Sequence, residues 1–340
     1  MAPLQLVLPL LSLALPQLAA AAMPKPRHFV VALVDDLGGF NVPWRNPEQR
    51  MADDLVQLST KEGMRLENFY TFKYCSPTRS SFLSARFPLH VNELNGGSCD
   101  SGGIDLRMKL LPQKLAAVKY RSYMIGKGHI GSRSAANLPV NRGFDHHLGF
   151  LGGGEDHWTQ SNGGVVDLWL DDAPAWGLNG TAYSCDMYSG KAVALIEDHA
   201  ANHADQGMFM YLPFHDVHEP YEAEDRFIDP SIKDKGRQTM AAMVSCVSEG
   251  TGNVSRALRQ AGMWESALFL WSADNGGPQY WLGNNHPLRG GKGVDFEGGV
   301  AGAAFVTGGA LPAHLWGQAS DSPMHVADAS HSQSPPQLDD

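Results

Sequence analysis

Four short apolar runs stand out along the chain, and each is followed closely by ionisable or amide side chains. The runs cover residues 28–34, 121–125, 208–214 and 267–271. Short runs rich in β-branched and aromatic residues, bounded by glycine and polar residues, are typical of buried strands. The side chains that follow them are, in chain order, Asp35 and Asp36; Lys127 and His129; His215, Asp216 and His218; and Asp274 and Asn275.

Between these runs lie segments with a helical pattern. Residues 50–62, 110–120, 189–203 and 237–261 carry apolar side chains at intervals of three and four. This spacing places them on one face of a helix. Strands that alternate with helices predict an α/β fold, with a mainly parallel central sheet flanked by helices. Ligands of such sheets bind beyond the carboxyl ends of the strands, so the four polar clusters predict one active site there.

Composition limits the classes of function. The chain has 340 residues, of which 43% are hydrophobic, enough for one large α/β domain or two ordinary ones. The formal net charge of −10 argues against a nucleic acid as partner. It leaves room for an anionic substrate, because a local group of lysine, arginine and histidine can hold an anion in an acidic protein. Residues 320–340 are rich in Ser, Pro, His and Asp and lack apolar periodicity, which predicts a low-complexity, disordered tail.

The N-terminus has the form of an export signal. Residues 1–22 are rich in leucine and end in small residues, which predicts a secretory signal peptide; a buried N-terminal helix is the alternative. Two prolines argue against a membrane-spanning helix here, and no other run is long enough to cross a bilayer, so we expect no transmembrane segment. The sequons at Asn179 and Asn253 also favour export. We therefore expect a protein of the secretory pathway, secreted or lysosomal.

Cysteine is too scarce for a disulfide scaffold, since the chain has only Cys75, Cys99, Cys185 and Cys246. If Cys75 is used for chemistry, at most one internal bridge can form. Cys75 stands directly before a predicted helix, because Pro77 suits a first helical turn and residues 80–86 continue it. A helix N-terminus favours an anion through its free N–H groups and its dipole. The segment alone leaves a buried or disulfide-bonded cysteine equally open.

Two motifs resemble the signatures of a known enzyme family. Residues 75–79 (CSPTR) resemble the C-x-P-x-R signature of sulfatases, and residues 126–131 (GKGHIG) resemble the second signature, G-K-W-H-L-G. Residues 141–145, 217–220, 274–277 and 284–289 are similar to the arylsulfatase B branch, and the resemblance runs from about residue 28 to residue 310. The chain departs from the pattern at Ala85, where glycine is usual, at Gly128, where tryptophan is usual, and at Ser248, where aspartate is usual.

The resemblance implies a fold and an activity. The fold would be the alkaline phosphatase-like sulfatase fold, with residues 23–319 as the catalytic domain. A smaller C-terminal sheet and helix, usual in the family, would be missing from this chain. The activity would be hydrolysis of sulfate esters of sugars or aryl compounds. Cys75 would be oxidised to formylglycine by a formylglycine-generating enzyme, and the hydrate of this aldehyde would supply the oxygen that attacks sulfur.

The resemblance also assigns residues to a metal site. Asp35, Asp36, Asp274 and Asn275 would hold one calcium ion together with the formylglycine oxygen at position 75. A hard divalent cation prefers oxygen ligands, which these side chains offer. The alternative for Asp35 and Asp36 is a solvated turn after a strand.

The same correspondence gives roles to the positively charged and histidine side chains. Arg79 would steady the hydrate, and Lys127 and Lys292 would bind sulfate oxygens. His218 would donate a proton to the leaving alcohol, and His129 would act on the hydrate when sulfate is eliminated. His215 and His286 receive no role.

Two other functions stay open. One is a catalytically impaired sulfatase-like protein that binds sulfated glycans, and the other is a related phosphate or phosphonate monoester hydrolase. Cys75 within its full signature favours the sulfatase.

Overall fold

A ten-stranded sheet forms the centre of the molecule. The computed structural model describes residues 26–94 and 103–333. The strand order is β13-β2-β12-β11-β1-β10-β4-β5-β8-β9. The central strands are β11 (Ala267–Ala273), β1 (His28–Val34), β10 (Gly207–Phe214), β4 (Tyr120–Ile125) and β5 (His146–Gly149), and they are mutually parallel. The predicted α/β fold is confirmed, and the four apolar runs form four of these five strands.

Short strands complete both edges of the sheet. On one side lie β12 (Ala304–Thr307) and β2 (Met64–Leu66), each antiparallel to its inner neighbour, and then β13 (Ala319–Ser320). On the other side lie β8 (Trp169–Leu170) and β9 (Ala173–Pro174), which are also antiparallel. Two-stranded pairs form between β3 (Phe69–Tyr70) and β14 (Met324–His325), and between β6 (Ser161–Asn162) and β7 (Val165–Val166). Most of these strands are too short to show an apolar period in the sequence.

The register of the three central strands places their carboxyl ends side by side. Val34 at the end of β1 pairs with Phe214 of β10 and with Ala273 of β11. The residues that follow these strands therefore meet at one edge of the sheet. Asp35 N–H donates to the carbonyl of Asp216 at 2.9 Å, and Asp274 N–H donates to the carbonyl of Val34 at 3.0 Å.

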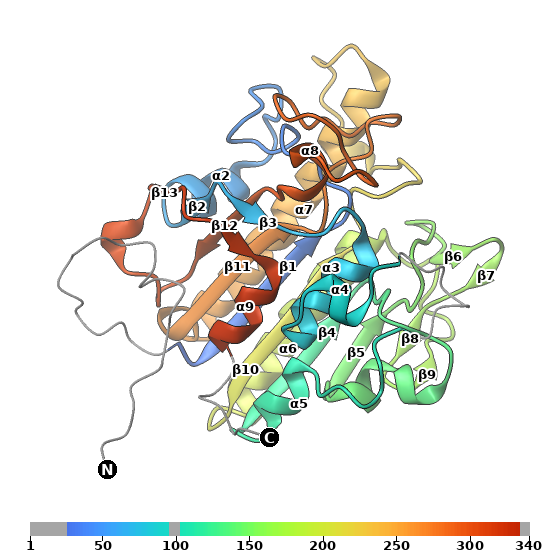
Figure 1. Cartoon of the computed structure of the whole chain (residues 1–340), viewed down its shortest axis with the longest axis vertical. Coiled ribbons are helices and arrows are strands. Elements are labelled where there is room, and N and C mark those ends of the chain that lie inside the picture. The colour runs from blue at the N-terminus through green and yellow to red at the C-terminus, as the bar shows by residue number, and fades with distance from the viewer. Residues whose placement is uncertain (1–25, 95–102, 334–340) are drawn as a thin grey trace.

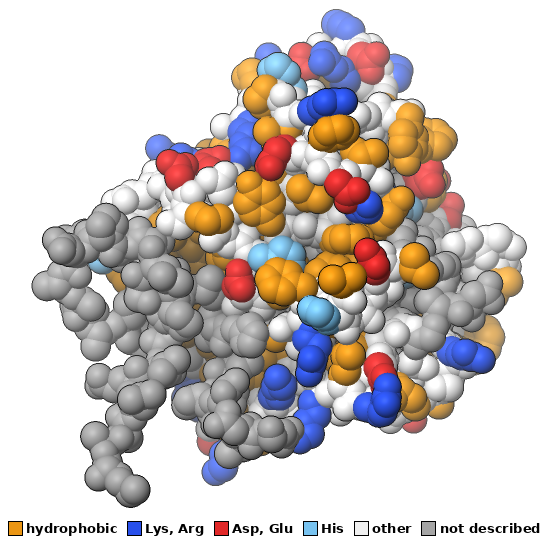
Figure 2. Space-filling view, in the orientation of Figure 1, with side chains coloured by type: hydrophobic (Ala, Val, Ile, Leu, Met, Phe, Trp, Pro, Cys, Tyr) orange, Lys and Arg blue, Asp and Glu red, His pale blue; other side chains and the backbone are white. Residues whose placement is uncertain are grey.

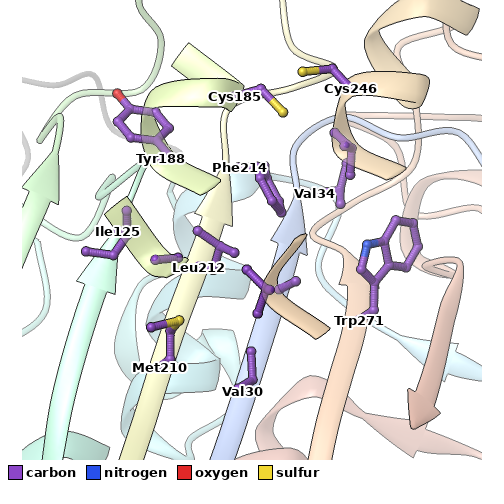
Figure 3. Packing of buried hydrophobic residues seen from close by; sticks show 14 of the residues in the cluster. Val30, Val34, Ile125, Cys185, Tyr188, Met210, Leu212, Phe214, Cys246 and Trp271 are labelled. Carbon is purple, nitrogen blue, oxygen red and sulfur yellow. The ribbon is translucent and has the colours of Figure 1, made fainter. Parts of the chain in front are cut away.

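Helices cover both faces of the sheet (Figure 1). On one face, α2 (Asp53–Thr60), α6 (Ser184–Asn202) and α7 (Lys235–Gln260) pack on alternate residues of β1, including Val30 and Val34. Figure 3 shows this cluster, with Tyr188, Cys185 and Cys246 of the helices above Phe214 and Trp271 of the strands. On the other face, α3 (Cys75–Ser84) and α5 (Leu111–Ala116) pack on Val31 and Leu33.

Smaller helical segments connect these elements. The remaining α-helices are α4 (Pro88–Val91), α8 (Glu297–Val300) and α9 (Val326–Gln333). Single 3₁₀ turns cover Ala135–Asn137, Pro139–Arg142, Asp225–Phe227, Trp264–Ser266 and Ala313–Leu315. Figure 2 shows charged side chains of both signs interspersed with apolar ones over the upper half of the viewed face. Within the described residues, no helix has both the length and the apolar character that a membrane-spanning segment needs.

Two sequence predictions are corrected by the fold. The helix predicted over residues 110–120 ends at Ala116, because Lys119 adopts a left-handed conformation (φ 63°) and Tyr120 begins β4. The tail predicted to be disordered is ordered over residues 324–333, where β14 and α9 form. Val326 and Ala329, three residues apart, are buried against the cluster that contains α3, and two apolar positions are too few to show a period. Residues 334–340, the predicted signal peptide and Cys99 lie outside the described residues.

Candidate active site

Cys75 is the first residue of α3, at the edge where the central strands end. Tyr74 before it is extended, and Pro77 lies in the first turn as predicted. Cys75 is buried, with its sulfur 3.2 Å from Asp35 Oδ1 and 3.8 Å from Asp36 Oδ1. Burial and the charges of Asp274 and Asp35 raise the pKa of the thiol well above its ordinary value. Cys75 is therefore held as an uncharged thiol.

Ala85 ends α3 in the left-handed conformation, with φ 59°. This conformation is strained for a residue with a Cβ and is the one that glycine adopts most readily at a helix C-terminus. The family's usual glycine would adopt this left-handed conformation without strain, whereas Ala85 adopts it with backbone strain.

Four oxygen-bearing side chains meet beside the sulfur. Asp36 N–H donates to Asp274 Oδ1 at 3.2 Å, and Asn275 Nδ2 donates to Asp36 Oδ1 at 2.8 Å. Asn275 Oδ1 is buried and has no hydrogen-bond partner among the described residues. Single ligand atoms of Asp35, Asp36, Cys75 and His218 all lie within 4.8 Å of one another. Clustered carboxylates beside an asparagine whose buried amide oxygen has no partner among the described residues suit a hard divalent cation, so these residues fit the implied calcium.

Three cationic side chains face these acids. Arg79 donates to Asp274 Oδ2 through Nε at 3.1 Å and Nη2 at 2.7 Å, and its Nη1 donates to the carbonyl of Lys127 at 3.1 Å. Lys127 Nζ forms an ion pair with Asp35 Oδ2. Lys292 Nζ donates to Asp36 Oδ2 at 2.7 Å. Three carboxylates and three cations therefore neutralise one another in a pocket in which Arg79 and Lys127 are fully buried.

The pKa values of two acids in this pocket are shifted in opposite directions. Burial opposes ionisation of Asp35, but the charges of Lys127 and His218 outweigh it and hold its pKa well below the ordinary value. Burial and the charge of Asp35 raise the pKa of Asp274, against the opposing effect of Arg79. Of these two acids, Asp35 is therefore held more firmly in its ionised form.

His218 presents one ring nitrogen to the pocket. Its Nδ1 lies 2.8 Å from the carbonyl oxygen of Glu219, and because a carbonyl only accepts, Nδ1 carries the proton. Nε2 lies 3.6 Å from Asp36 Oδ2 and is left as the nitrogen that can exchange a proton with a ligand. Burial and the charge of Lys127 lower the pKa of His218, so the ring loses its charge more readily than in water.

His129 reaches the same pocket from the loop after β4. A Cβ on Gly153 would lie 2.9 Å from the His129 ring, and a Cβ on Gly154 would lie 3.2 Å from the His218 ring. The two histidines therefore lie over neighbouring glycines of one loop, which approaches them closely because it has no side chains there. All the residues predicted for the site, metal ligands included, thus converge at this edge of the sheet.

The departure at Gly128 leaves the second signature well anchored. The Lys127, Gly128 and His129 N–H groups donate to the carbonyls of Pro213, Phe150 and Leu151 at 2.9, 2.7 and 3.1 Å. A Cβ on Gly128 would lie 2.9 Å from the Phe150 oxygen, so the backbone here packs too closely for a side chain. Lys127 and His129 are therefore held by main-chain hydrogen bonds.

The departure at Ser248 is remote from the chemistry. Ser248 Oγ accepts from the N–H of Leu55 in the first turn of α2 at 3.1 Å. This hydrogen bond joins α7 to the start of α2, and the residue has a structural role.

Sequence reasoning placed His215 and Asp216 at this edge of the sheet but gave them no role, and it missed His157. His215 and Asp216 are fully buried beside His218, and His157 from the loop after β5 is buried against them. His215 and Asp216 follow β10, so their place at the carboxyl end of a strand was the available signal. No sequence motif connected His157 with them.

Comparison with known proteins decides the family. The sulfatase family model matches residues 27–333, which is most of the chain. This chain belongs to the sulfatase family. Arylsulfatase J of Mus musculus is 33% identical to this sulfatase over 300 residues, which are 86% of this chain and 49% of that protein. The sulfatase chain spans about half the length of the curated relatives it matches.

Solved structures confirm the sulfatase's fold. The crystal structure of Ps i-CgsB, a protein also solved in complex with k-i-k-neocarrahexaose, has a TM-score of 0.84 and 25% identity, and covers 93% of this chain and 73% of that one. A protein of the alkaline phosphatase superfamily from Vibrio parahaemolyticus has a TM-score of 0.57 and 16% identity, and covers 91% and 65%. The fold of this sulfatase is therefore the predicted alkaline phosphatase-like α/β fold.

Proposed function

We propose that this chain hydrolyses sulfate esters, with a nucleophile made from Cys75 and a bound calcium ion. The observation that carries the proposal is the position of the Cys75 sulfur, 3.2 Å from Asp35 Oδ1, in a pocket lined by Arg79, Lys127 and Lys292. Cleavage of a sulfate ester develops negative charge on oxygen atoms, and fixed cations stabilise it best where water is excluded.

The nucleophile requires maturation of Cys75. A formylglycine-generating enzyme, with its own oxidant, would convert the side chain to an aldehyde, and the hydrate of the aldehyde supplies the attacking hydroxyl. Asp35, Asp36, Asp274 and Asn275 would hold calcium, which when bound lowers the charge repulsion between the pocket and the substrate. The partnerless Asn275 Oδ1 supports this assignment.

The remaining side chains bind the sulfate and move protons. Lys127 and Lys292 bind sulfate oxygens, and Arg79 keeps Asp274 in place. His218 acts in the doubly protonated form that a bound anionic ester favours: its Nε2 donates a proton to the oxygen of the leaving alcohol, while the attacking hydroxyl gives its proton to solvent and the His218 ring regains one from solvent. His129 accepts a proton from the remaining hydroxyl at position 75 as sulfate departs, and returns it to solvent. Water then restores the hydrate, so overall one water supplies the oxygen carried off by sulfate and the hydrogen gained by the alcohol.

The substrate class is a sulfated sugar or an aryl sulfate. A carbohydrate is supported by the similarity to Ps i-CgsB, which was solved in complex with k-i-k-neocarrahexaose. The resemblance to the arylsulfatase B branch stays a prediction, and assaying 4-sulfated N-acetylgalactosamine against other sulfated sugars tests it.

The mass of the peptide that contains Cys75 tests the nucleophile. In protein from its native host, we expect this peptide to have lost one sulfur and two hydrogens and gained one oxygen. Cys75→Ala should abolish release of sulfate from 4-nitrophenyl sulfate and leave the unfolding midpoint close to that of the parent. An unmodified thiol, or turnover that persists in Cys75→Ala, would refute the assignment.

The two rival functions give different outcomes. A glycan-binding protein without activity would bind a sulfated oligosaccharide and show no turnover even when position 75 is converted. A phosphate or phosphonate monoester hydrolase would cleave 4-nitrophenyl phosphate faster than 4-nitrophenyl sulfate. We expect the sulfate to be the better substrate.

We also propose that the chain enters the secretory pathway and is secreted or lysosomal. Residues 178–181 lie largely exposed at the surface, whereas Asn253 lies within α7 and the Ser255 of its sequon is buried. Expression in a mammalian host should give removal of residues 1–22 and a glycan at Asn179 rather than Asn253. Retention of the whole N-terminus in a cytosolic fraction would contradict this.

A further inference from the structure

Behind His218 lies a stack of aromatic rings that the mechanism does not use. The rings of His215 and His218 have centroids 5.2 Å apart at an interplanar angle of 30°, and those of His157 and His215 are 4.3 Å apart at 26°. Tyr183 also stacks on His157, at 5.2 Å and 12°. The four rings therefore form one column, and His218 stands at its end nearest the pocket.

Hydrogen bonds attach His157 to the backbone of His218. His157 Nε2 lies 3.0 Å from the carbonyl oxygen of His218, and Nδ1 lies 3.0 Å from Ser184 Oγ. A carbonyl only accepts, so Nε2 donates to it. His157 therefore ties the main chain of His218 to the first residue of α6.

Contacts with Asp216 also hold the column in place. Tyr183 OH donates to Asp216 Oδ1 at 2.6 Å, and Asp216 Oδ2 lies 3.6 Å from His157 Nδ1. Both Asp216 side-chain oxygens thus face members of the column. Because Asp216 directly follows His215 in the chain, the tyrosine, the aspartate and two of the histidines form one connected group.

His215 is enclosed on its remaining sides. The Phe150 ring meets it edge to face at 5.0 Å, and a Cβ on Gly154 would lie 3.2 Å from the His218 ring and 3.8 Å from His215. Its Nε2 faces the Glu155 N–H at 3.5 Å, and its Nδ1 has no hydrogen-bond partner among the described residues. Among the described residues, the contacts of its two nitrogens do not reach the pocket, so its part is packing rather than proton transfer.

We propose that His215, held in place by His157, is a positioning residue that fixes the ring plane of His218 so that Nε2 faces the pocket. A proton donor must lie within hydrogen-bond reach of the atom it serves, and a misplacement of about 1 Å can cost on the order of a hundredfold in rate. Without the stack, the ring would be oriented by the hydrogen bond from Nδ1 to the Glu219 carbonyl. Burial lowers the pKa of His215 well below its ordinary value, so an uncharged ring packs against His218.

Two substitutions of His215 distinguish a packing role of its ring from a role of its ring nitrogens. His215→Ala removes the ring, and His215→Phe keeps a planar ring of similar size without the nitrogens. The full chain, matured with a formylglycine-generating enzyme, is assayed with calcium on 4-nitrophenyl sulfate. We expect kcat to fall at least about tenfold in His215→Ala with KM changed less than about twofold, and to stay within about threefold of the parent in His215→Phe.

His314→Ala is the matched control, because His314 is exposed in a distant 3₁₀ turn, and its rates should equal those of the parent. If His215→Ala does not fold, His215→Leu takes its place with the same expectation, since leucine fills the space without a planar ring. A kcat of the alanine or leucine variant within twofold of the parent would overturn the proposal. So would a phenylalanine variant as slow as the alanine variant.

The consequence for turnover rests on the proposed function, but the orientation of His218 can be measured without it. Long-range proton–nitrogen correlation spectra report which ring nitrogen of a neutral histidine carries the proton. We expect the Nδ1-protonated form of His218 in the parent and in His215→Phe, and a mixture of forms in His215→Ala. An inactive parent with these spectra would refute the hydrolase alone, whereas unchanged His218 signals in His215→Ala would refute the positioning role.

Discussion

Lys292 donates a 2.7 Å hydrogen bond to Asp36 although 256 residues separate them in the chain. Burial opposes the charged form of the lysine, but the charges of Asp36 and Asp35 and the hydrogen bond to Asp36 outweigh it and raise the pKa. Lys127 forms an ion pair with Asp35. Both proposed sulfate-binding lysines are thus paired with the acids proposed to hold calcium.

This pairing predicts that calcium and sulfate assist each other's binding. A cation that binds Asp35 and Asp36 neutralises the partners of the two lysines, which then become available to an anion. We expect inorganic sulfate to bind at least about tenfold more tightly with saturating calcium than with a chelator, within the usual range of coupling between sites. Isothermal titration calorimetry measures this, with chloride as the control anion. Equal sulfate affinities with and without calcium would contradict the prediction.

Arg79→Lys should destabilise the fold. Arg79 makes two hydrogen bonds to Asp274 and one to the carbonyl of Lys127, and it is fully buried. A lysine cannot reproduce the planar fork, and a buried acid left without its partner is costly. We expect a loss of about 2–4 kcal/mol in the free energy of unfolding, measured with urea. Arg237→Lys on the exposed start of α7 is the control and should stay within about 0.5 kcal/mol. An unchanged midpoint for Arg79→Lys would count against the network.

Ala85→Gly should stabilise the protein. Ala85 has a left-handed backbone at the end of α3, which glycine adopts without strain. The expected gain is about 0.5–1 kcal/mol after the greater freedom of glycine in the unfolded chain is included. Ala194→Gly, at an exposed position inside α6, should do the opposite by a similar amount. Melting temperatures that move in the same direction for both variants would show that strain at Ala85 is absent.

Acid should destabilise the fold through His147. Burial lowers the pKa of this histidine to about 4 from its ordinary 6.5. Because the folded pKa is the lower one, the stabilisation is fully present above about pH 6.5 and is lost as the pH falls toward 4. Each pH unit between the unfolded and folded pKa values corresponds to roughly 1.4 kcal/mol. The contribution of His147 to the free energy of unfolding is therefore about 3 kcal/mol above pH 6.5, and about 2 kcal/mol of it is lost by pH 5.

Urea unfolding of His147→Gln at pH 7 and pH 5 checks this. Glutamine can still donate to the carbonyl of Met124, which His147 Nδ1 contacts at 3.1 Å, but it does not titrate. We expect the loss between pH 7 and pH 5 to shrink by about 2 kcal/mol in this variant and not in His314→Gln. The same loss in the parent and in His147→Gln would assign the acid sensitivity to other groups.

Much of the fold followed from local patterns. The run over residues 28–34 forms β1, and α6 and α7 lie within a few residues of their predicted ends, because long periodic segments bury one face. The edge strands and α9 did not follow, since two to four residues hold no period. Their pairing partners, such as Phe69 for Met324, lie far away in the chain.

The sequence by itself determined which residues could do chemistry. The signature around Cys75 and the polar residues after the strands named most of the residues proposed for the site, because these motifs are local, and the family resemblance added Lys292. Only the tertiary structure decided that Asp36 and Lys292 pair, that Asn275 Oδ1 has no partner among the described residues, and that His157 and His215 stack behind His218. These relationships depend on strand register and on loops from distant segments packing together, and no local pattern of side chains encodes them.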